Sequence, residues 1–149
     1  MKNMLLLSGC PGSGKSTLAR TIQSKYPKEE FVILSTDEYW GPEYKFDLTK
    51  LRGAHIWNQK RCRDYCELGR NVIIDNTNTT FKEVEHYLDI AKEFGYWVSI
   101  VRPTTEWAIN AEVCYNKNVH GVPYPTILKM MERLDADLED KVLEYMINE

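Results

Sequence analysis

The chain has 149 residues and a formal net charge of −3, with 43% hydrophobic and 28% charged residues. This length suits one domain with a sizeable core, and the composition is ordinary for a soluble globular protein. The small negative charge argues against a protein that coats nucleic acid, although one that grips a single end stays compatible with it. No apolar run approaches the ~20 residues that cross a bilayer, and the N-terminus lacks a secretory signal, so we expect a cytoplasmic protein.

Four short apolar runs alternate with segments of helical periodicity, which predicts an open α/β sheet of parallel strands. The runs cover residues 4–8, 31–35, 72–75 and 97–101, and their continuous apolar character predicts strands that are covered on both faces. Helices are predicted over 14–26, roughly 48–68 and 80–94, with Gly69 and Gly95 in C-cap positions and a capping pattern from Thr80 to Glu83. The remainder is predicted to hold a helix near 106–115, a turn over 121–125 and a final helix from Thr126.

The first apolar run leads into a glycine-rich turn that matches the phosphate-binding pattern G-x-x-x-x-G-K-[ST], and a helical segment follows it. Glycines let the backbone bend around a polyanion and present its N–H groups, and the helix N-terminus adds positive partial charge. In this arrangement Lys15 would reach the β- and γ-phosphates and Ser16 would hold Mg²⁺. The predicted nucleotide-binding residues are Gly9, Cys10, Pro11, Gly12, Ser13, Gly14, Lys15, Ser16 and Thr17. We therefore predict an α/β P-loop NTPase, a single domain over 1–149 with four to five mostly parallel strands, flanking helices and a helical lid.

Acidic residues follow the second and third apolar runs, and ligands of open parallel sheets bind beyond the carboxyl ends of the strands. Asp37 is predicted to accept the proton of an attacking hydroxyl, the base role in phosphoryl transfer; capping of the next segment is the alternative. Glu38 is adjacent and is expected to point elsewhere. Asp75 is predicted to help hold Mg²⁺ and its waters, although Asp also ends apolar runs for turn reasons.

Three uncharged polar residues, Asn76, Thr77 and Asn78, follow Asp75 directly. They supply hydrogen-bond donors and acceptors that we expect to face the same cleft. Such groups are suited to the sugar or base of a substrate, so we predict that at least one of them contacts it.

Residues 114–123 have the character of a lid, because they leave a helix and contain Gly and Pro hinges. Lys117 is predicted to place positive charge over the γ-phosphate, as a third catalytic residue beside Asp37 and Lys15, although Arg is commoner in this role. His120 is either part of this device or a hinge residue bonded to the backbone. Arg102, just past the fourth apolar run, is a weaker candidate for the nucleotide.

Basic residues outnumber acidic ones between Lys45 and Arg70, and the balance reverses from Glu132 onward. The basic segment is either a solvated helix face or a contact for an anionic substrate. The four cysteines do not form the disulfide framework of a secreted protein. Cys62 and Cys66 lie four positions apart on a predicted helix that also carries His55, but we favour buried thiols over a metal site there.

Six short segments stand out along the chain: Gly-Cys-Pro-Gly-Ser-Gly-Lys-Ser-Thr (9–17), Ser-Thr-Asp (35–37), Ala-His-Ile-Trp-Asn-Gln (54–59), Asp-Asn-Thr-Asn (75–78), Gly-Tyr (95–96) and Asn-Val-His-Gly-Val-Pro (118–123). Together they resemble the P-loop polynucleotide-kinase module, known from phage nucleic-acid end-healing enzymes and from some animal ubiquitin-ligase-binding proteins. Many kinases share the first segment, and its combination with the last two is much more specific. The resemblance implies transfer of the ATP γ-phosphate to a 5′-hydroxyl of RNA or DNA. It also implies that Asp37 is the general base and that Lys15 and Ser16 lie at the phosphates.

Three positions depart from the family pattern. Lys117 stands where a lid arginine is expected, which keeps the charge and loses the two-pronged geometry. Trp40 stands where the phage enzyme has an arginine that contacts the acceptor's phosphate, and Asp75 lies one residue before the position of its carboxylate, here Asn76. The acceptor is therefore expected to be held differently. Trp40 is a candidate to stack on a base, the alternative being that it fills the core.

We therefore expect a Mg²⁺-assisted kinase whose partners are ATP and a nucleic-acid 5′-end. Two alternatives stay open: a P-loop kinase of another hydroxyl (a nucleoside, a nucleotide or a hydroxymethylated DNA base), and a nucleotide-binding module without transfer. Asp37 argues against the last, because a hydrolytic switch usually orients its water with a glutamine or glutamate. The lack of a guanine-recognition motif mildly favours ATP over GTP.

Overall fold

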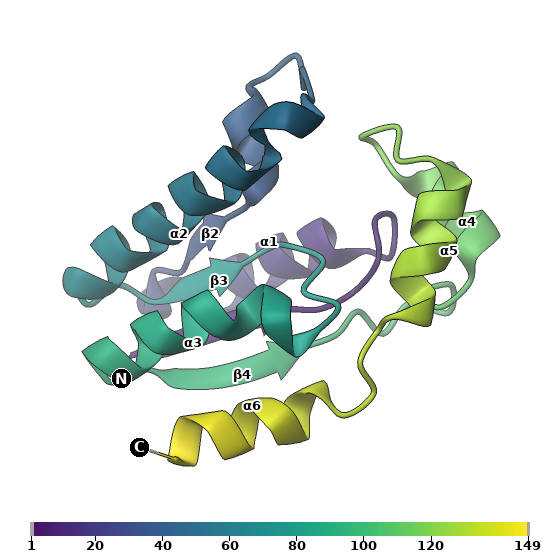
Figure 1. Ribbon diagram of the computed structural model, residues 1–149. Helices are drawn as coiled ribbons and strands as arrows, with labels where there is room; N and C mark the ends of the chain where they lie inside the picture. Colours follow the sequence, from purple (N-terminus) through teal and green to yellow (C-terminus); the bar gives the residue numbers. More distant parts are fainter. Residues whose placement is uncertain (1, 149) are drawn as a thin grey trace.

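The computed structural model describes residues 2–148. Within them, four parallel strands form one sheet in the order β2-β3-β1-β4 (Figure 1). The strands are β1 (Asn3–Leu7), β2 (Val32–Leu34), β3 (Val72–Ile74) and β4 (Trp97–Val101). This arrangement confirms the predicted open parallel α/β sheet, which has four strands where four to five were predicted.

Helices cover both faces of the sheet, and alternating strand residues divide between them. Met4, Leu6 and Ile74 belong to the core beneath α2 (Leu51–Glu67), α3 (Phe81–Phe94) and α6 (Leu138–Ile147). Leu7 and Ile73 belong to the core on the opposite face, beneath α1 (Lys15–Lys25). Because successive residues face opposite sides of the sheet and both sides are covered, the central strands β1 and β3 are continuous apolar runs.

The prediction that every strand is covered on both faces is wrong for β4. This strand lies at the edge of the sheet, and its Trp97 is 69% exposed. Val98 and Ile100 pack against the core, whereas Trp97 and Ser99 face outward. This edge strand therefore leaves Trp97 and Ser99 exposed, although its sequence is as apolar as that of a central strand.

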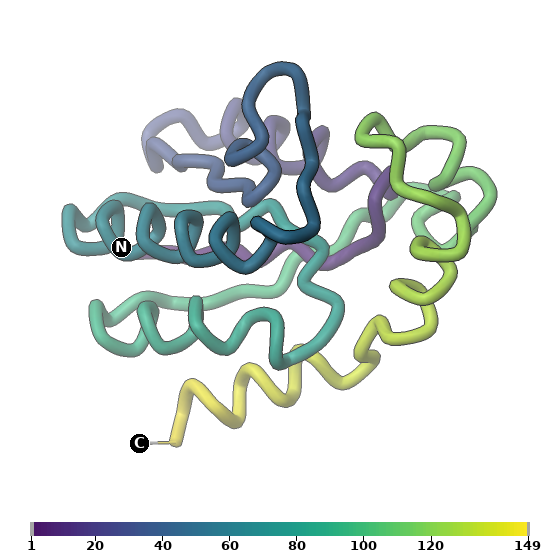
Figure 2. The backbone as a smooth tube through the Cα atoms, turned by 45° about the horizontal axis from the view of Figure 1, so that its top comes forward, coloured from purple at the N-terminus to yellow at the C-terminus, as the bar shows by residue number. Residues whose placement is uncertain are grey.

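The remaining elements are α4 (Ala111–Lys117), α5 (Tyr124–Glu132) and three short 3₁₀ helices, η1 (Pro27–Glu29), η2 (Thr36–Trp40) and η3 (Leu48–Lys50). Of these, η1 precedes β2 at the amino ends of the strands, where Asn71 donates to the Glu29 carbonyl, and the others follow the carboxyl ends. Figure 2 shows the loop after η2 rising beside the loop that joins α4 to α5. These two segments stand on either side of the edge of the sheet at which ligands of such folds bind.

Several predicted helix boundaries need correction. The helix expected near 106–115 begins only at Ala111, where the Asn110 side chain accepts a hydrogen bond from the backbone N–H of Val113. The expected final helix is two separate helices, α5 and α6. The capping box of Thr80 with Glu83 is confirmed, and Gly95 ends α3 at a φ of 73°. In the described part of the chain, no helix combines the length and apolar character needed to cross a membrane.

Candidate active site

The P-loop joins β1 to α1 and is held by hydrogen bonds from two sides. The backbone N–H of Gly9 donates to the carbonyl of Thr77 at the end of β3 (2.9 Å). On the lid side, the indole Nε1 of Trp107 donates to the Gly12 carbonyl at 3.0 Å, and the Thr105 hydroxyl donates to the Ser13 carbonyl at 2.9 Å. The loop is therefore ordered by its surroundings before any ligand binds.

Gly12 is a position at which only glycine fits. Its φ of 79° is in the left-handed region, and a Cβ there would lie 2.0 Å from the backbone oxygen of Cys114 in α4. Cys10 packs with Cys114 and Ile127 in a small core beneath the loop. Burial, followed by the neighbouring Cys114, raises the pKa of the Cys10 thiol to about 11. Cys10 is thus a protonated packing residue at neutral pH.

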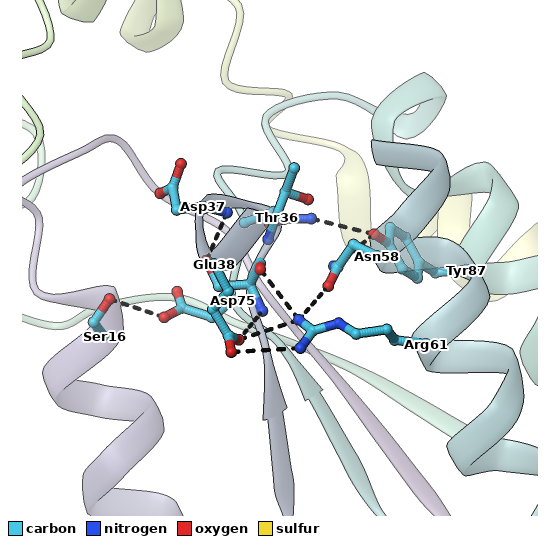
Figure 3. A network of polar contacts seen from close by, with 10 residues as sticks. Ser16, Thr36, Asp37, Glu38, Asn58, Arg61, Asp75 and Tyr87 are labelled. Atoms are coloured by element: carbon cyan, nitrogen blue, oxygen red, sulfur yellow. Dashed lines mark hydrogen bonds and ion pairs between the residues drawn. The ribbon is translucent and has the colours of Figure 1, made fainter. Parts of the chain in front are cut away.

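Ser16 and Asp75 form the pair that the sequence predicts for Mg²⁺. The Ser16 hydroxyl donates to Oδ2 of Asp75 at 2.8 Å (Figure 3). The other carboxylate oxygen of Asp75 is buried and has no hydrogen-bond partner. A hydroxyl beside an unpartnered carboxylate oxygen is a fitting donor set for a hard cation, which prefers oxygen ligands. No group of three or more His, Cys, Asp or Glu side chains suited to a metal ion occurs among residues 2–148, so Mg²⁺ would also draw ligands from phosphate and water.

Asp37 follows β2 on η2, and the helix is capped without it. The Ser35 hydroxyl accepts from the backbone N–H of Asp37 (3.3 Å), and Glu38 accepts from the backbone N–H of Ser35 (3.0 Å). Glu38 also forms an ion pair with Arg61 of α2 at 3.1 Å, and Figure 3 shows Asp37 and Glu38 pointing away from each other. Ser35 and Glu38, and not Asp37, therefore cap η2.

The Asp37 carboxylate contacts side chains from two loops. Its Oδ1 accepts a hydrogen bond from the Tyr44 hydroxyl at 3.0 Å, and its Oδ2 lies 3.5 Å from Nε2 of His120. Burial and the Asp37 charge raise the pKa of Tyr44, so its hydroxyl stays protonated and donates. The Asp37 side chain is 47% exposed, which leaves room for an incoming hydroxyl.

One cleft of about 1060 Å³ brings most of the predicted site residues together. Pockets for small ligands typically measure ~300–1000 Å³, so this cleft is large enough to hold one. From the predicted set, the residues that line the cleft are Pro11, Gly12, Gly14, Lys15, Ser16, Thr17, Asp37, Trp40, Asp75, Asn76, Thr77 and Lys117.

Asn78 does not face this cleft, and the prediction that it does is wrong. Its side chain is 1% exposed and donates to the carbonyl of Leu7 at 2.6 Å, while its backbone has a φ of 43°. The Asn76 amide accepts from the backbone N–H of Thr36 at 3.0 Å and donates to the Tyr87 hydroxyl at 3.3 Å. Asn76 therefore ties the end of β3 to the segment that carries Asp37, and Thr77 is left as the freer polar group.

Trp40 borders the cleft, but its side chain is 8% exposed. It packs edge to face against Tyr39 and Phe46, with ring centroids 5.3 and 5.0 Å away. This packing favours the alternative that Trp40 fills the core. Because so little of Trp40 is exposed, little of its ring is left for stacking on a base.

Lys117 lies at the end of α4, with its Nζ 4.3 Å from the centroid of the Trp107 ring. Trp107 is itself bonded to the P-loop, so this cation–π contact keeps the positive charge beside the phosphate-binding backbone. Arg102, by contrast, pairs with Glu139 at 2.7 Å and donates to the Asp135 carbonyl. The Arg102 guanidinium thus anchors α6 and does not line the cleft.

Tyr44 and His55 also line the cleft, and neither is among the site residues predicted from the sequence. Burial lowers the pKa of His55, against opposing effects of Glu83 and Asp37, and its Nδ1 lies 3.5 Å from the Thr36 hydroxyl. His55 belongs to the Ala-His-Ile-Trp-Asn-Gln segment of the resemblance, which was the available signal. Nothing in the sequence around Tyr44 distinguishes it from an ordinary loop tyrosine.

The basic segment proves to be mostly a paired helix face. Its ion pairs are Lys45–Glu43, Lys60–Asp64, Arg61–Glu38 and Arg63–Glu93. Lys50 and Arg52, at the start of α2, are exposed, and neither forms an ion pair with another described residue. If this segment contacts an anionic ligand, we therefore expect Lys50 and Arg52 to make the contact.

Comparison with known proteins gives both sequence relatives and fold relatives. The chain is 40% identical over 132 residues to NEDD4-binding protein 2 of Homo sapiens, which covers 87% of this chain and 7% of that protein. It is 31% identical over 143 residues to the 2′,3′-cyclic-nucleotide 3′-phosphodiesterase of Pongo abelii, covering 91% of this chain and 32% of that protein. The chain thus spans a third or less of the length of these curated relatives.

Two solved structures share the fold at low sequence identity. A chain of the Pnkp1/Rnl/Hen1 RNA repair complex gives a TM-score of 0.72 at 20% identity, over 94% of this chain and 46% of that chain. The APS kinase CysC of Mycobacterium tuberculosis, in complex with AMPPNP and APS, gives 0.55 at 14% identity, over 99% and 76%. The sequence also matches the AAA domain family AAA_33 over residues 4–136. The chain therefore belongs to the AAA_33 family and has its P-loop kinase-like fold.

Proposed function

We propose that this chain is a single P-loop kinase domain that transfers the γ-phosphate of ATP to a 5′-hydroxyl of RNA or DNA. One observation carries the proposal: the Asp37 carboxylate, freed from capping by Ser35, opens into the cleft that also holds Lys15 and the Ser16–Asp75 pair. A general base must lie within hydrogen-bond reach of the proton that it takes. An acceptor hydroxyl that enters this cleft can meet that requirement.

Each residue has a separate task in the proposed reaction. Asp37 accepts the proton of the acceptor hydroxyl, and the backbone N–H groups of residues 12–16 hold the phosphates of the nucleotide. Lys15 and Lys117 offset negative charge on the transferred group from the P-loop side and from the lid side. Mg²⁺, when bound at Ser16 and Asp75, would neutralise further charge on the phosphate oxygens.

A nucleic-acid acceptor is the finer part of the proposal. It is supported by the resemblance of six segments to the polynucleotide-kinase module and by the fold relative in an RNA repair complex. The exposed cations Lys50 and Arg52 are also available to contact phosphates of a strand. A cytoplasmic location belongs to the same proposal and is supported by four cysteines that are all free.

The phosphodiesterase named among the relatives is not assigned to this chain. The matched segment is 32% of that protein, and the name does not say which part carries the activity. The cleft described above supplies a phosphate-binding loop and one acidic base, the parts that phosphoryl transfer requires. A kinase of a smaller hydroxyl uses the same parts and is therefore the competing proposal.

The deciding experiment incubates the protein with Mg²⁺, γ-labelled ATP and a panel of acceptors. The panel holds 5′-hydroxyl RNA, 5′-hydroxyl DNA, free nucleosides, nucleotides and DNA with hydroxymethylated bases. Label on an oligonucleotide 5′-end, with salt-dependent KM, supports the proposal. Label on nucleosides, nucleotides or hydroxymethylated bases alone would replace it with the smaller acceptor, and binding of ATP without any transfer would remove the kinase assignment.

The variant Asp37→Asn tests the base. It should retain ATP binding and lose about 10²- to 10⁴-fold in turnover, the range typical for general-base catalysis. Asp64→Asn is a matched control, because Asp64 forms an exposed pair with Lys60 on α2. Full turnover by Asp37→Asn would remove Asp37 from this role.

A further inference from the structure

The ring of Tyr44 lies beside the proposed base, at the place where an acceptor must enter. Its hydroxyl is 3.0 Å from Oδ1 of Asp37, and both residues line the cleft. An acceptor oxygen within reach of Asp37 therefore brings the group attached to it close to the Tyr44 ring. For a nucleic-acid 5′-end, that group is one ribose with its base.

The backbone holds Tyr44 in a conformation that bulky residues seldom adopt. Its φ is 47°, and the turn is closed by hydrogen bonds from the Tyr44 N–H to the Gly41 carbonyl and from the Phe46 N–H to the Tyr44 carbonyl (3.0 and 3.1 Å). An aromatic residue in the left-handed region is uncommon, and such strained residues cluster at functional sites. The strain supports a role for the position of this ring.

One face of the Tyr44 ring is already covered by a flat heterocycle. The imidazole of His120 stacks on it with centroids 4.0 Å apart and planes 21° apart. His120 comes from the opposite side of the cleft, on the loop between α4 and α5. Its neighbours are loosely placed: Val119 is 85% exposed, and a Cβ at Gly121 would meet nothing within 4 Å.

We propose that Tyr44 is the stacking platform for the 5′-terminal nucleobase of the acceptor, and that His120 leaves this ring face when the base arrives. The inference rests on the proposed function and specifies which part of the substrate the site recognises. An imidazole has the shape of the five-membered half of a purine, so the observed stack shows that a flat nitrogen heterocycle fits there. Trp40, the aromatic residue that the sequence suggests for stacking, is buried against Tyr39 and Phe46.

The test compares two 5′-hydroxyl oligonucleotides that differ only in whether the first nucleotide carries a base or is abasic. For the unmodified protein, the abasic acceptor should have a KM about 5- to 150-fold higher, the effect of one stacked base. Tyr44→Leu should raise the KM of the base-bearing acceptor by that factor and so remove the difference between the two acceptors. Tyr44→Phe, which keeps the ring and loses the hydroxyl, should retain the discrimination even if its turnover falls.

A second measurement does not require transfer. An oligonucleotide with 2-aminopurine as its first base should lose fluorescence on binding to the unmodified protein and to Tyr44→Phe, and much less on binding to Tyr44→Leu. His120→Ala should lower the KM of the base-bearing acceptor because it uncovers the ring; a higher KM would overturn the displacement.

The outcomes separate the two proposals. Quenching that depends on Tyr44, without transfer, would support the platform and end the kinase assignment. Transfer with equal KM for both acceptors, or with discrimination that survives Tyr44→Leu, would overturn the platform alone. The absence of both transfer and quenching would end both proposals.

Discussion

The close approach of α4 to the P-loop makes Gly12→Ala an informative perturbation. The new Cβ would lie 2.0 Å from the carbonyl oxygen of Cys114, 2.8 Å from its carbonyl carbon and 3.0 Å from the Asn118 nitrogen, where ordinary contact begins at 3.4 Å. All three atoms belong to backbone, so no side chain can rotate away. Either α4 or the P-loop must move, and such a movement would also disturb the hydrogen bond from Trp107, in the loop before α4, to the Gly12 carbonyl.

Two effects add in this variant. An alanine at a φ of 79° carries a left-handed backbone cost of about 1–2 kcal/mol. Forcing extra volume into a packed contact typically costs a further ~1–3 kcal/mol. Gly69→Ala isolates the first effect, because Gly69 has a φ of 77° and a methyl group added there would meet nothing within 4 Å. The free energy of unfolding should therefore fall by about 2–5 kcal/mol in Gly12→Ala and by about 1–2 kcal/mol in Gly69→Ala.

Urea unfolding measures both values, and a titration with ATP measures binding. Gly12→Ala should weaken ATP binding as well, because the backbone N–H groups of the P-loop lose their alignment, whereas Gly69→Ala should bind ATP normally. Equal destabilisation of the two variants, with unchanged ATP affinity in both, would show that α4 does not press on the loop in solution. The lid side would then not be what orders the P-loop.

Two further predictions concern Lys117 and His55. Lys117→Ala should lower kcat for the transfer reaction about 10²-fold with little change in ATP affinity, because it removes one charge-stabilising group. Steady-state rates test this, with Lys129→Ala as the control because Lys129 is an exposed lysine on α5. An unchanged kcat in Lys117→Ala would require another cation in the lid. Burial lowers the pKa of His55 below its ordinary value of about 6.5, so the unfolded chain binds a proton at a higher pH than the native protein does. Stability should therefore fall as the pH drops through about 6.5, and His55→Gln should lose less stability between about pH 7 and 5 in urea unfolding. The same pH slope in both proteins would contradict this origin.

The sequence predicts those parts of the site that are local in the chain. Ser16 lies in a contiguous pattern, and Asp37 and Asp75 each follow an apolar run, so their placement at the carboxyl edge follows from the parallel sheet. The start of the helix before the lid is harder to predict from the sequence. Residues 106–109 form no helix, and the Trp107 side chain instead donates a hydrogen bond to the Gly12 carbonyl of the P-loop. That contact joins positions far apart in sequence, which local periodicity does not report.

Pairs that meet across the cleft were beyond sequence reasoning for the same reason. Tyr44 and His120 meet only because two loops face each other over the end of the sheet. Neither loop contains a pattern that specifies the other. The Asn78 side chain gives the opposite case: its place after a strand predicts an exposed polar group, but a left-handed φ turns it inward to bond with the Leu7 carbonyl.

The choice between two adjacent carboxylates at the end of β2 is made by α2. Arg61 neutralises Glu38 and also donates to the Ser35 carbonyl, so η2 is held in one orientation and the next carboxylate, Asp37, is directed at the cleft. The same guanidinium donates to Asn58, whose amide bonds to the Tyr87 hydroxyl together with Asn76 (Figure 3). A single helix therefore positions the strand end that carries the proposed base and braces the strand end that carries Asp75. Because a base displaced by about 1 Å can lose ~10²-fold in rate, this shared support explains why polar groups such as Asn58 and Tyr87 are committed to a network behind the cleft.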